Sequence, residues 1–176
     1  MPFYDDIYEI AADNYGLVTS NEAKAMGVSD KEMSRLASDG RLIRLGRGLY
    51  RIKHYSPTTN DPYAEAVALV GTGAYLFGES VIAMHGLAPT NPARITVATS
   101  RRVRKKLPSS IRVIRRKEED TLTQYEGIPS QNIPDAILAC RSTIMTDRLE
   151  DAVRNARRNG LITEDENKNL LRELGK

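Results

Sequence analysis

The sequence of 176 residues contains one cysteine, two histidines and no tryptophan. Cys140 alone cannot form an internal disulfide, which fits a reducing compartment. The usual structural zinc ligand sets, four Cys or Cys2His2, cannot be assembled from this chain. We therefore expect no disulfide, no metal and no cofactor.

Long apolar runs are also missing. The longest apolar stretch, residues 64–78, is interrupted by Glu65 and by glycines, and it falls short of the roughly 20 apolar residues that span a membrane. The N-terminus carries Asp5 and Asp6 and lacks the basic start and apolar core of a signal peptide. These features predict a cytoplasmic protein with no membrane partner.

Catalytic motifs are equally scarce. Gly71-Thr72-Gly73 lacks the Gly-Lys-Ser/Thr ending of a phosphate-binding loop. Cys140, His85 and Asp135 could be imagined as a nucleophilic arrangement, but their spacing matches no motif, and a buried structural thiol is favoured. The sequence therefore predicts that the protein is not an enzyme.

What the sequence does have is an uneven charge distribution behind a net charge of +3. Residues 40–55 carry five basic residues and no acidic one, and residues 94–117 carry ten basic residues and no acidic one. Residues 1–39 and 118–176 are both net acidic. Two basic segments of this kind indicate binding to nucleic acid or to an acidic partner protein.

The first 55 residues predict a winged helix-turn-helix. Ile7, Ile10, Ala11 and Tyr15 follow helical spacing up to Gly16. Two capping boxes, Thr19 with Glu22 and Ser29 with Glu32, then start two short helices that end at Gly27 and Asp39-Gly40. Alternation over residues 42–45 and 49–52, around the turn Gly46-Arg47-Gly48, indicates a β-hairpin.

The remaining chain predicts a small α+β domain. Residues 56–60 form a turn-rich connector, and Asp61 as N-cap with Pro62 begins a helix that continues to Val70. We expect a helix over residues 78–84, strands over 94–99 and 111–115, and two C-terminal helices, the second with a capping box at Thr163. The predicted fold class is α+β, with a winged helix-turn-helix domain at 1–55 and an α+β domain at 61–176.

The candidate DNA-binding residues lie on three segments. In a helix-turn-helix the second helix enters the major groove, and Arg35 is the best candidate for a bidentate contact with guanine. The hairpin arginines are also suited to a groove or to phosphates, although they could simply protect an edge strand. The candidates are Ser29, Lys31, Ser34, Arg35 and Ser38 on the helix, Arg41, Arg44 and Arg47 on the hairpin, and Arg101, Arg102, Arg104, Lys105 and Lys106 between the two later strands.

The sequence resembles the AbiEi family, the antitoxins of type IV abortive-infection toxin-antitoxin systems. The similarity runs through residues 16–36 and 41–50, and it continues over residues 75–87, over Gly127-Ile128-Pro129 and over residues 147–163. The resemblance implies a repressor that binds operator repeats in the double-stranded DNA of its own operon, as a monomer or a homodimer. It also implies that the protein counteracts a nucleotidyltransferase-like toxin encoded beside it, and that the domain at 61–176 serves this antitoxin action or an interaction.

One alternative function belongs to a different class. The basic segment around residues 101–106 could bind an acidic or nucleotidyltransferase-like protein, without any sequence-specific contact to DNA. A basic segment on a loop can also be simply solvated.

Overall fold

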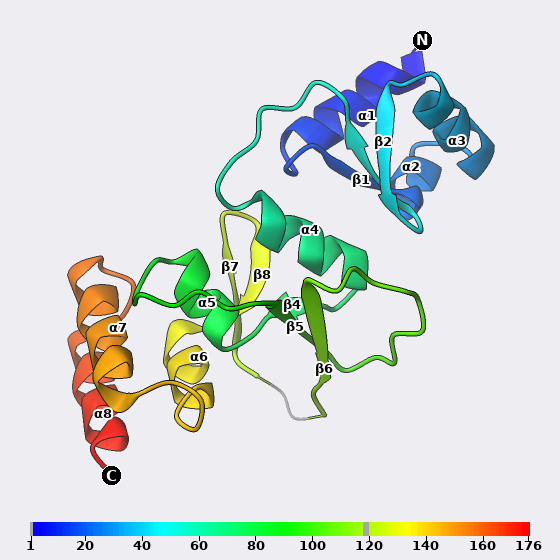
Figure 1. Ribbon diagram of the computed structural model, residues 1–176. Coiled ribbons are helices and arrows are strands. Elements are labelled where there is room, and N and C mark those ends of the chain that lie inside the picture. The colour runs from blue at the N-terminus through cyan, green and yellow to red at the C-terminus, as the bar shows by residue number, and fades with distance from the viewer. Residues whose placement is uncertain (1, 118–119) are drawn as a thin grey trace. The chain divides into compact units, whose positions relative to one another are not determined.

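The computed structural model describes residues 2–117 and 120–176, and it divides the chain into two compact units (Figure 1). Unit 1 contains residues 1–72 and 104–107, and unit 2 contains residues 73–103 and 108–176. In the described part of the chain, no helix combines the length and the apolar character needed to cross a membrane. The predicted functional division at residues 56–60 stays a prediction.

Unit 1 contains the predicted winged helix-turn-helix. Its elements are α1 (Pro2–Ala12), β1 (Leu17–Thr19), α2 (Ser20–Ala25), α3 (Asp30–Ser38), β2 (Leu42–Gly46), β3 (Leu49–Ile52) and α4 (Asp61–Val70). The three strands form an antiparallel sheet in the order β1-β3-β2. The predicted hairpin is confirmed, and β1 adds a third strand that the alternation pattern did not predict.

Both capping boxes form as predicted. Thr19 accepts a hydrogen bond from the backbone nitrogen of Glu22, and the Glu22 carboxylate accepts one from the backbone nitrogen of Thr19 at 2.7 Å. Ser29 and Glu32 make the same pair of bonds at the start of α3. These caps satisfy backbone donors that have no partner within the helix, and they fix where α2 and α3 begin.

Strand β3 has two covered faces. Tyr50 and Ile52 belong to the core that α1, α2 and α3 form with the sheet. Arg51 points to the opposite side, because successive side chains of a strand alternate, and there its Nη1 lies 3.0 Å from Oε2 of Glu65 on α4. The core cluster consists of Ile7, Ala11, Val18, Ala23, Val28, Met33, Leu36, Leu42, Tyr50 and Ile52.

Two boundaries differ from the sequence prediction. Helix α1 ends at Ala12, and Tyr15 lies outside it with a positive φ of 55°, so the spacing of Tyr15 was fortuitous. At α4 the N-cap position is Asn60, not Asp61. The Asp61 carboxylate instead accepts hydrogen bonds from the Thr58 hydroxyl at 2.7 Å and from the Tyr55 hydroxyl at 3.1 Å, and these bonds order the connector.

Unit 2 is a mixed sheet with helices. Its elements are β4 (Tyr75–Leu76), α5 (Glu79–Met84), β5 (Ile95–Thr99), β6 (Ile111–Arg115), β7 (Leu122–Tyr125), β8 (Ile128–Gln131), α6 (Ile133–Ala139), α7 (Thr146–Arg158) and α8 (Glu164–Leu174). The strand order is β6-β5-β4-β8-β7, and the pairs β5·β6 and β4·β8 are parallel. The molecule is therefore α+β, as the sequence predicts.

The C-terminal helices of unit 2 bury one stripe each. Leu149, Ala152, Val153 and Ala156 on α7 are at most 1% exposed, and the Thr163 capping box starts α8 as predicted. Helices α7 and α8 contact each other, and both contact α6.

The basic segment between β5 and β6 has no regular secondary structure. The two strands that it joins are parallel, so the segment must run back along the sheet. Residues 104–107 group with unit 1, whereas Arg101 and Arg102 group with unit 2. Some of the second basic block thus belongs to the unit that carries the winged helix.

We predict different stability losses for two glycine-to-alanine substitutions. Gly16 and Gly27 both have a positive φ, of 70° and 83°, which costs an alanine about 1–2 kcal/mol. A β carbon at Gly16 would also lie 2.6 Å from Cγ of Tyr55, whereas nothing lies within 4 Å of one at Gly27. Urea denaturation should show that Gly16→Ala loses roughly 1–3 kcal/mol more unfolding free energy than Gly27→Ala.

Equal losses for the two variants would mean that Tyr55 does not pack against Gly16. The connector would then not be fastened to the winged helix.

Candidate nucleic-acid interface

Helix α3 separates its side chains into two faces. Met33 and Leu36 are 0% and 3% exposed and pack into the core. The exposed side chains are Asp30, which pairs with Lys24, and then Lys31, Ser34, Arg35 and Ser38. Hydroxyl, ammonium and guanidinium groups can donate hydrogen bonds to base edges and to phosphates. The structure therefore brings four of the five predicted helix residues to exposed positions on α3.

Ser29, the fifth predicted residue, acts at the start of the helix. Its hydroxyl accepts a hydrogen bond from the Glu32 backbone nitrogen at 3.2 Å and donates one to the Glu32 carboxylate at 3.1 Å. Hydrogen bonds from the Ser29 backbone and side chain lower the pKa of Glu32. Because the hydroxyl is already engaged, a DNA contact by Ser29 would have to share it with the cap.

Two hairpin arginines are exposed beside α3. Arg47 lies at the turn between Gly46 and Gly48, and Arg44 lies on β2, where its Nε is 3.5 Å from the Gly46 carbonyl oxygen. Neither side chain forms an ion pair with a described residue. Both can therefore accept an external anion.

Arg41 and Arg51 have internal contacts. The guanidinium of Arg41 lies over the ring of Tyr4, 5.1 Å from its centroid, and remains exposed. Arg51 pairs with Glu65 and lies 5.9 Å from the centroid of the Tyr55 ring. Arg51 therefore joins the hairpin to α4 and does not belong to the exposed arginines.

A hollow of about 330 Å³ lies between α3 and the hairpin. We call it the α3–wing hollow. Its lining residues are Ser34, Ala37, Ser38, Arg44 and Tyr50. Three of these were predicted as DNA-binding residues from the sequence, whereas Tyr50 was read only as a strand residue.

Lys105 extends the positive surface of unit 1. Its Nζ would lie 3.5 Å from a β carbon at Gly71, at the end of α4. Burial lowers the pKa of Lys105, and the nearby charge of Arg47 lowers it further. The predicted residues Arg47 and Lys105, distant in sequence, therefore contribute to one region of positive potential.

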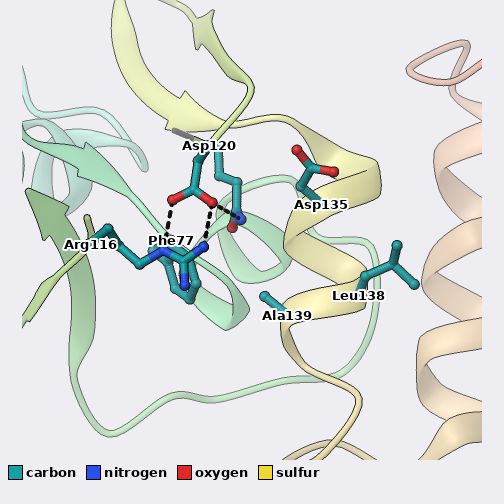
Figure 2. A pocket seen from close by; sticks show the side chains of 7 residues that line it. Phe77, Arg116, Asp120, Asp135, Leu138 and Ala139 are labelled. Atoms are coloured by element: carbon teal, nitrogen blue, oxygen red, sulfur yellow. Dashed lines mark hydrogen bonds and ion pairs between the residues drawn. The ribbon is translucent and has the colours of Figure 1, made fainter. Parts of the chain in front are cut away.

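A second hollow, of about 410 Å³, lies within unit 2 (Figure 2). Arg116 holds Asp120 through two hydrogen bonds, Nε to Oδ2 at 3.0 Å and Nη2 to Oδ1 at 2.8 Å, and its guanidinium lies over the Phe77 ring. The Tyr75 hydroxyl donates to the same carboxylate, and Gln131 Nε2 lies 3.4 Å from it. This network was not predicted from the sequence, because its members are scattered over 57 positions without a motif.

In this network the negative charge of Asp120 is paired with the positive charge of Arg116. Burial alone would raise the pKa of Asp120, but hydrogen bonds from Arg116 and Tyr75 outweigh it and leave the pKa lowered. Burial, together with the hydrogen bond to Asp120, raises the pKa of Tyr75 to about 12. A carboxylate that is ionised and fully bonded is suited to holding β4, β8 and the end of β6 together, and less suited to proton transfer.

The residues considered for nucleophilic chemistry do not form such a site. Cys140 is 2% exposed, and burial followed by the charge of Glu79 raises the pKa of its thiol to about 11. The ring of His85 contacts the ring of Tyr125, with centroids 4.1 Å apart. A thiol with this pKa carries little thiolate at neutral pH, so the structural interpretation of Cys140 is favoured.

The fold and its exposed α3 define unit 1 as a winged helix-turn-helix, a class in which the second helix and the hairpin usually contact DNA. Residues 5–53 match the family model described as "Transcriptional regulator, AbiEi antitoxin". The predicted resemblance is thus confirmed for this segment.

One solved structure with similarity along most of the chain is the "Crystal structure of RV2827C protein from Mycobacterium tuberculosis". The sequence identity is 16% and the TM-score is 0.42, and the similarity covers 97% of this chain and 81% of that chain. A comparison with curated proteins gave no match.

We predict that Asp120→Asn lowers stability in a pH-dependent way. Because the pKa of Asp120 is lowered in the folded state, its contribution is present above the unfolded pKa, near 4, and is lost as the pH falls through the folded value. Denaturation at pH 7 should show that Asp120→Asn has roughly 1–3 kcal/mol less unfolding free energy than wild type. This difference should become smaller below about pH 4.

Asp135→Asn is the matched control. Asp135 lines the same hollow without an ion pair to a described residue, so its substitution should change stability much less at pH 7. If the unfolding free energies of Asp120→Asn and wild type differ by the same amount from pH 7 to pH 3, the ionised pair is not the origin of that difference.

Proposed function

We propose that the protein is a transcriptional repressor that binds double-stranded operator DNA of its own operon and acts as the antitoxin of a type IV toxin-antitoxin system. The observation that carries this proposal is the exposed face of α3, with Arg35, beside an arginine at the hairpin tip. The AbiEi description of residues 5–53 supports the same function.

In the proposed complex α3 enters the major groove. Arg35 donates two hydrogen bonds to O6 and N7 of a guanine, and Lys31, Ser34 and Ser38 contact neighbouring base edges or phosphates. Arg44 and Arg47 of the hairpin contact the backbone or the adjacent minor groove. The five basic residues of segment 40–55, with no acidic residue among them, favour such contacts.

The basic loop adds contacts outside the winged helix. Arg101, Arg102, Arg104, Lys105 and Lys106 would neutralise phosphates without reading the sequence. Lys105 supports this proposal, because it lies in the same positive region as Arg47. Arg41 and Ser29 would contribute more weakly, since each already has an internal partner.

The second part of the proposal is the antitoxin role. The protein would counteract a nucleotidyltransferase-like toxin in the cytoplasm. It would do so either through contacts made by unit 2 or by repressing its own operon. The protein would bind operator repeats as a monomer or as a homodimer.

We predict that Arg35→Ala and Arg47→Ala weaken DNA binding in different ways. In gel-shift titrations with the region upstream of its own operon, Arg35→Ala should lose about tenfold or more in affinity and also lose preference over random DNA. Arg47→Ala should weaken both DNAs alike, and it should reduce the slope of log K against log salt by about one.

Arg172→Ala, an exposed arginine on α8, serves as the control and should bind like wild type. Equal affinity of the wild type for operator and random DNA, unchanged by Arg35→Ala, would contradict sequence-specific readout.

We also predict the effect of reversing charge on the basic loop. A variant with Arg101→Glu and Arg102→Glu should bind DNA more weakly at low salt and should keep any co-purification with the neighbouring gene product. Loss of that co-purification, with DNA binding intact, would favour the alternative in which the loop grips an acidic or nucleotidyltransferase-like protein.

A further inference from the structure

The α3–wing hollow is bordered by a tyrosine whose ring belongs to the core. Tyr50 is 3% exposed, yet it lines the hollow. Within residues 2–117 and 120–176 no group hydrogen-bonds its hydroxyl. The hydroxyl is not among the buried polar atoms that lack a partner, so it keeps some contact with solvent and can donate a hydrogen bond to a ligand in the hollow.

The other polar groups around the hollow are suited to the same type of ligand. Within the described part of the chain, Arg44 uses its Nε alone, for the Gly46 carbonyl oxygen, and its two terminal nitrogens remain for an external acceptor. Ser34 offers a hydroxyl, whereas the Ser38 hydroxyl is bonded to the Ser34 carbonyl oxygen at 3.0 Å. Among the residues that the structure describes, no carboxylate lines the hollow. Donors beside a guanidinium favour an oxyanion.

The register of the hairpin holds these groups in place. Arg44 and Tyr50 are directly paired across β2 and β3, so their side chains lie on the same face of the sheet. That face is the one against which α3 packs. The cation and the hydroxyl are therefore brought to the edge of α3 by strand pairing, and neither depends on a flexible loop.

We infer that the α3–wing hollow binds one phosphate of the DNA backbone, with the Tyr50 hydroxyl and the Arg44 guanidinium as donors. This inference rests on the proposed function. When α3 lies in the major groove and the hairpin reaches the neighbouring minor groove, the sugar-phosphate strand between the two grooves must cross the space between α3 and the hairpin. A donor that the core holds in place at that crossing fixes the register of the protein on the duplex.

The direct test is Tyr50→Phe, which removes one oxygen and keeps the ring in the core. A hydrogen bond to a charged phosphate predicts about a tenfold loss of affinity, equal for operator and random DNA. Tyr8→Phe, on the exposed side of α1, is the matched control and should bind like wild type. Both variants should melt within a few degrees of wild type.

A double-mutant cycle identifies the ligand as a backbone phosphate. Single methylphosphonates, which are neutral, are placed along the operator duplex. One position should weaken the wild type by about tenfold and weaken Tyr50→Phe and Arg44→Ala much less, because the shared contact has already been lost. A titration with inorganic phosphate at millimolar concentration tests whether the hollow is instead a site for free phosphate. In that case the added phosphate would shift the NMR resonances of Tyr50 in the protein without DNA.

The outcomes separate the inference from the function on which it rests. If Arg35→Ala weakens operator binding and Tyr50→Phe does not, the hollow does not bind a phosphate and the repressor function stands. If the wild type binds no DNA, both fail. Saturable binding of inorganic phosphate, without coupling to any methylphosphonate position, would overturn the assignment to DNA.

Discussion

The winged helix depends on the alternation of side chains along β3. Tyr50 and Ile52 complete the core under α1, α2 and α3, while Arg51 between them pairs with Glu65 on α4. A shift of one residue in strand pairing would exchange these faces and bury the arginine in the core, at a cost of several kcal/mol. The register of β3 therefore specifies both the packing of α3 and the attachment of α4.

The same alternation sorts the positive charges of unit 1. Arg51 lies on the face of the sheet that α4 covers. Arg44 lies on the other face, together with Tyr50, and stays beside α3. The positive region then gains Lys105 from a loop between two strands of unit 2. A net charge of only +3 thus conceals a concentrated positive region, because the acidic residues lie mainly in the first 39 and the last 59 positions.

The capping boxes were predicted correctly from the sequence, whereas the end of α1, the cap of α4 and the contacts between distant residues were not. The capping boxes at Thr19, Ser29 and Thr163 predicted where helices begin, since a cap is made by residues three positions apart. Strands β1 and β4 were missed because they are short and pair with strands distant in the sequence. Strands β7 and β8 were missed although they form a local hairpin around Glu126-Gly127. The unpartnered hydroxyl of Tyr50 and the pairing of Arg116 with Asp120 gave no sequence signal either, as each depends on contacts that only the fold creates.

The central claim is that α3 and the hairpin form the DNA-contacting surface. Amide chemical shifts of the full chain, recorded by NMR with and without the operator duplex, test this claim directly. The account predicts the largest shifts in residues 30–38 and 44–50, with smaller ones in residues 101–106. Shifts confined to unit 2, with α3 and the hairpin unchanged at saturation, would contradict it.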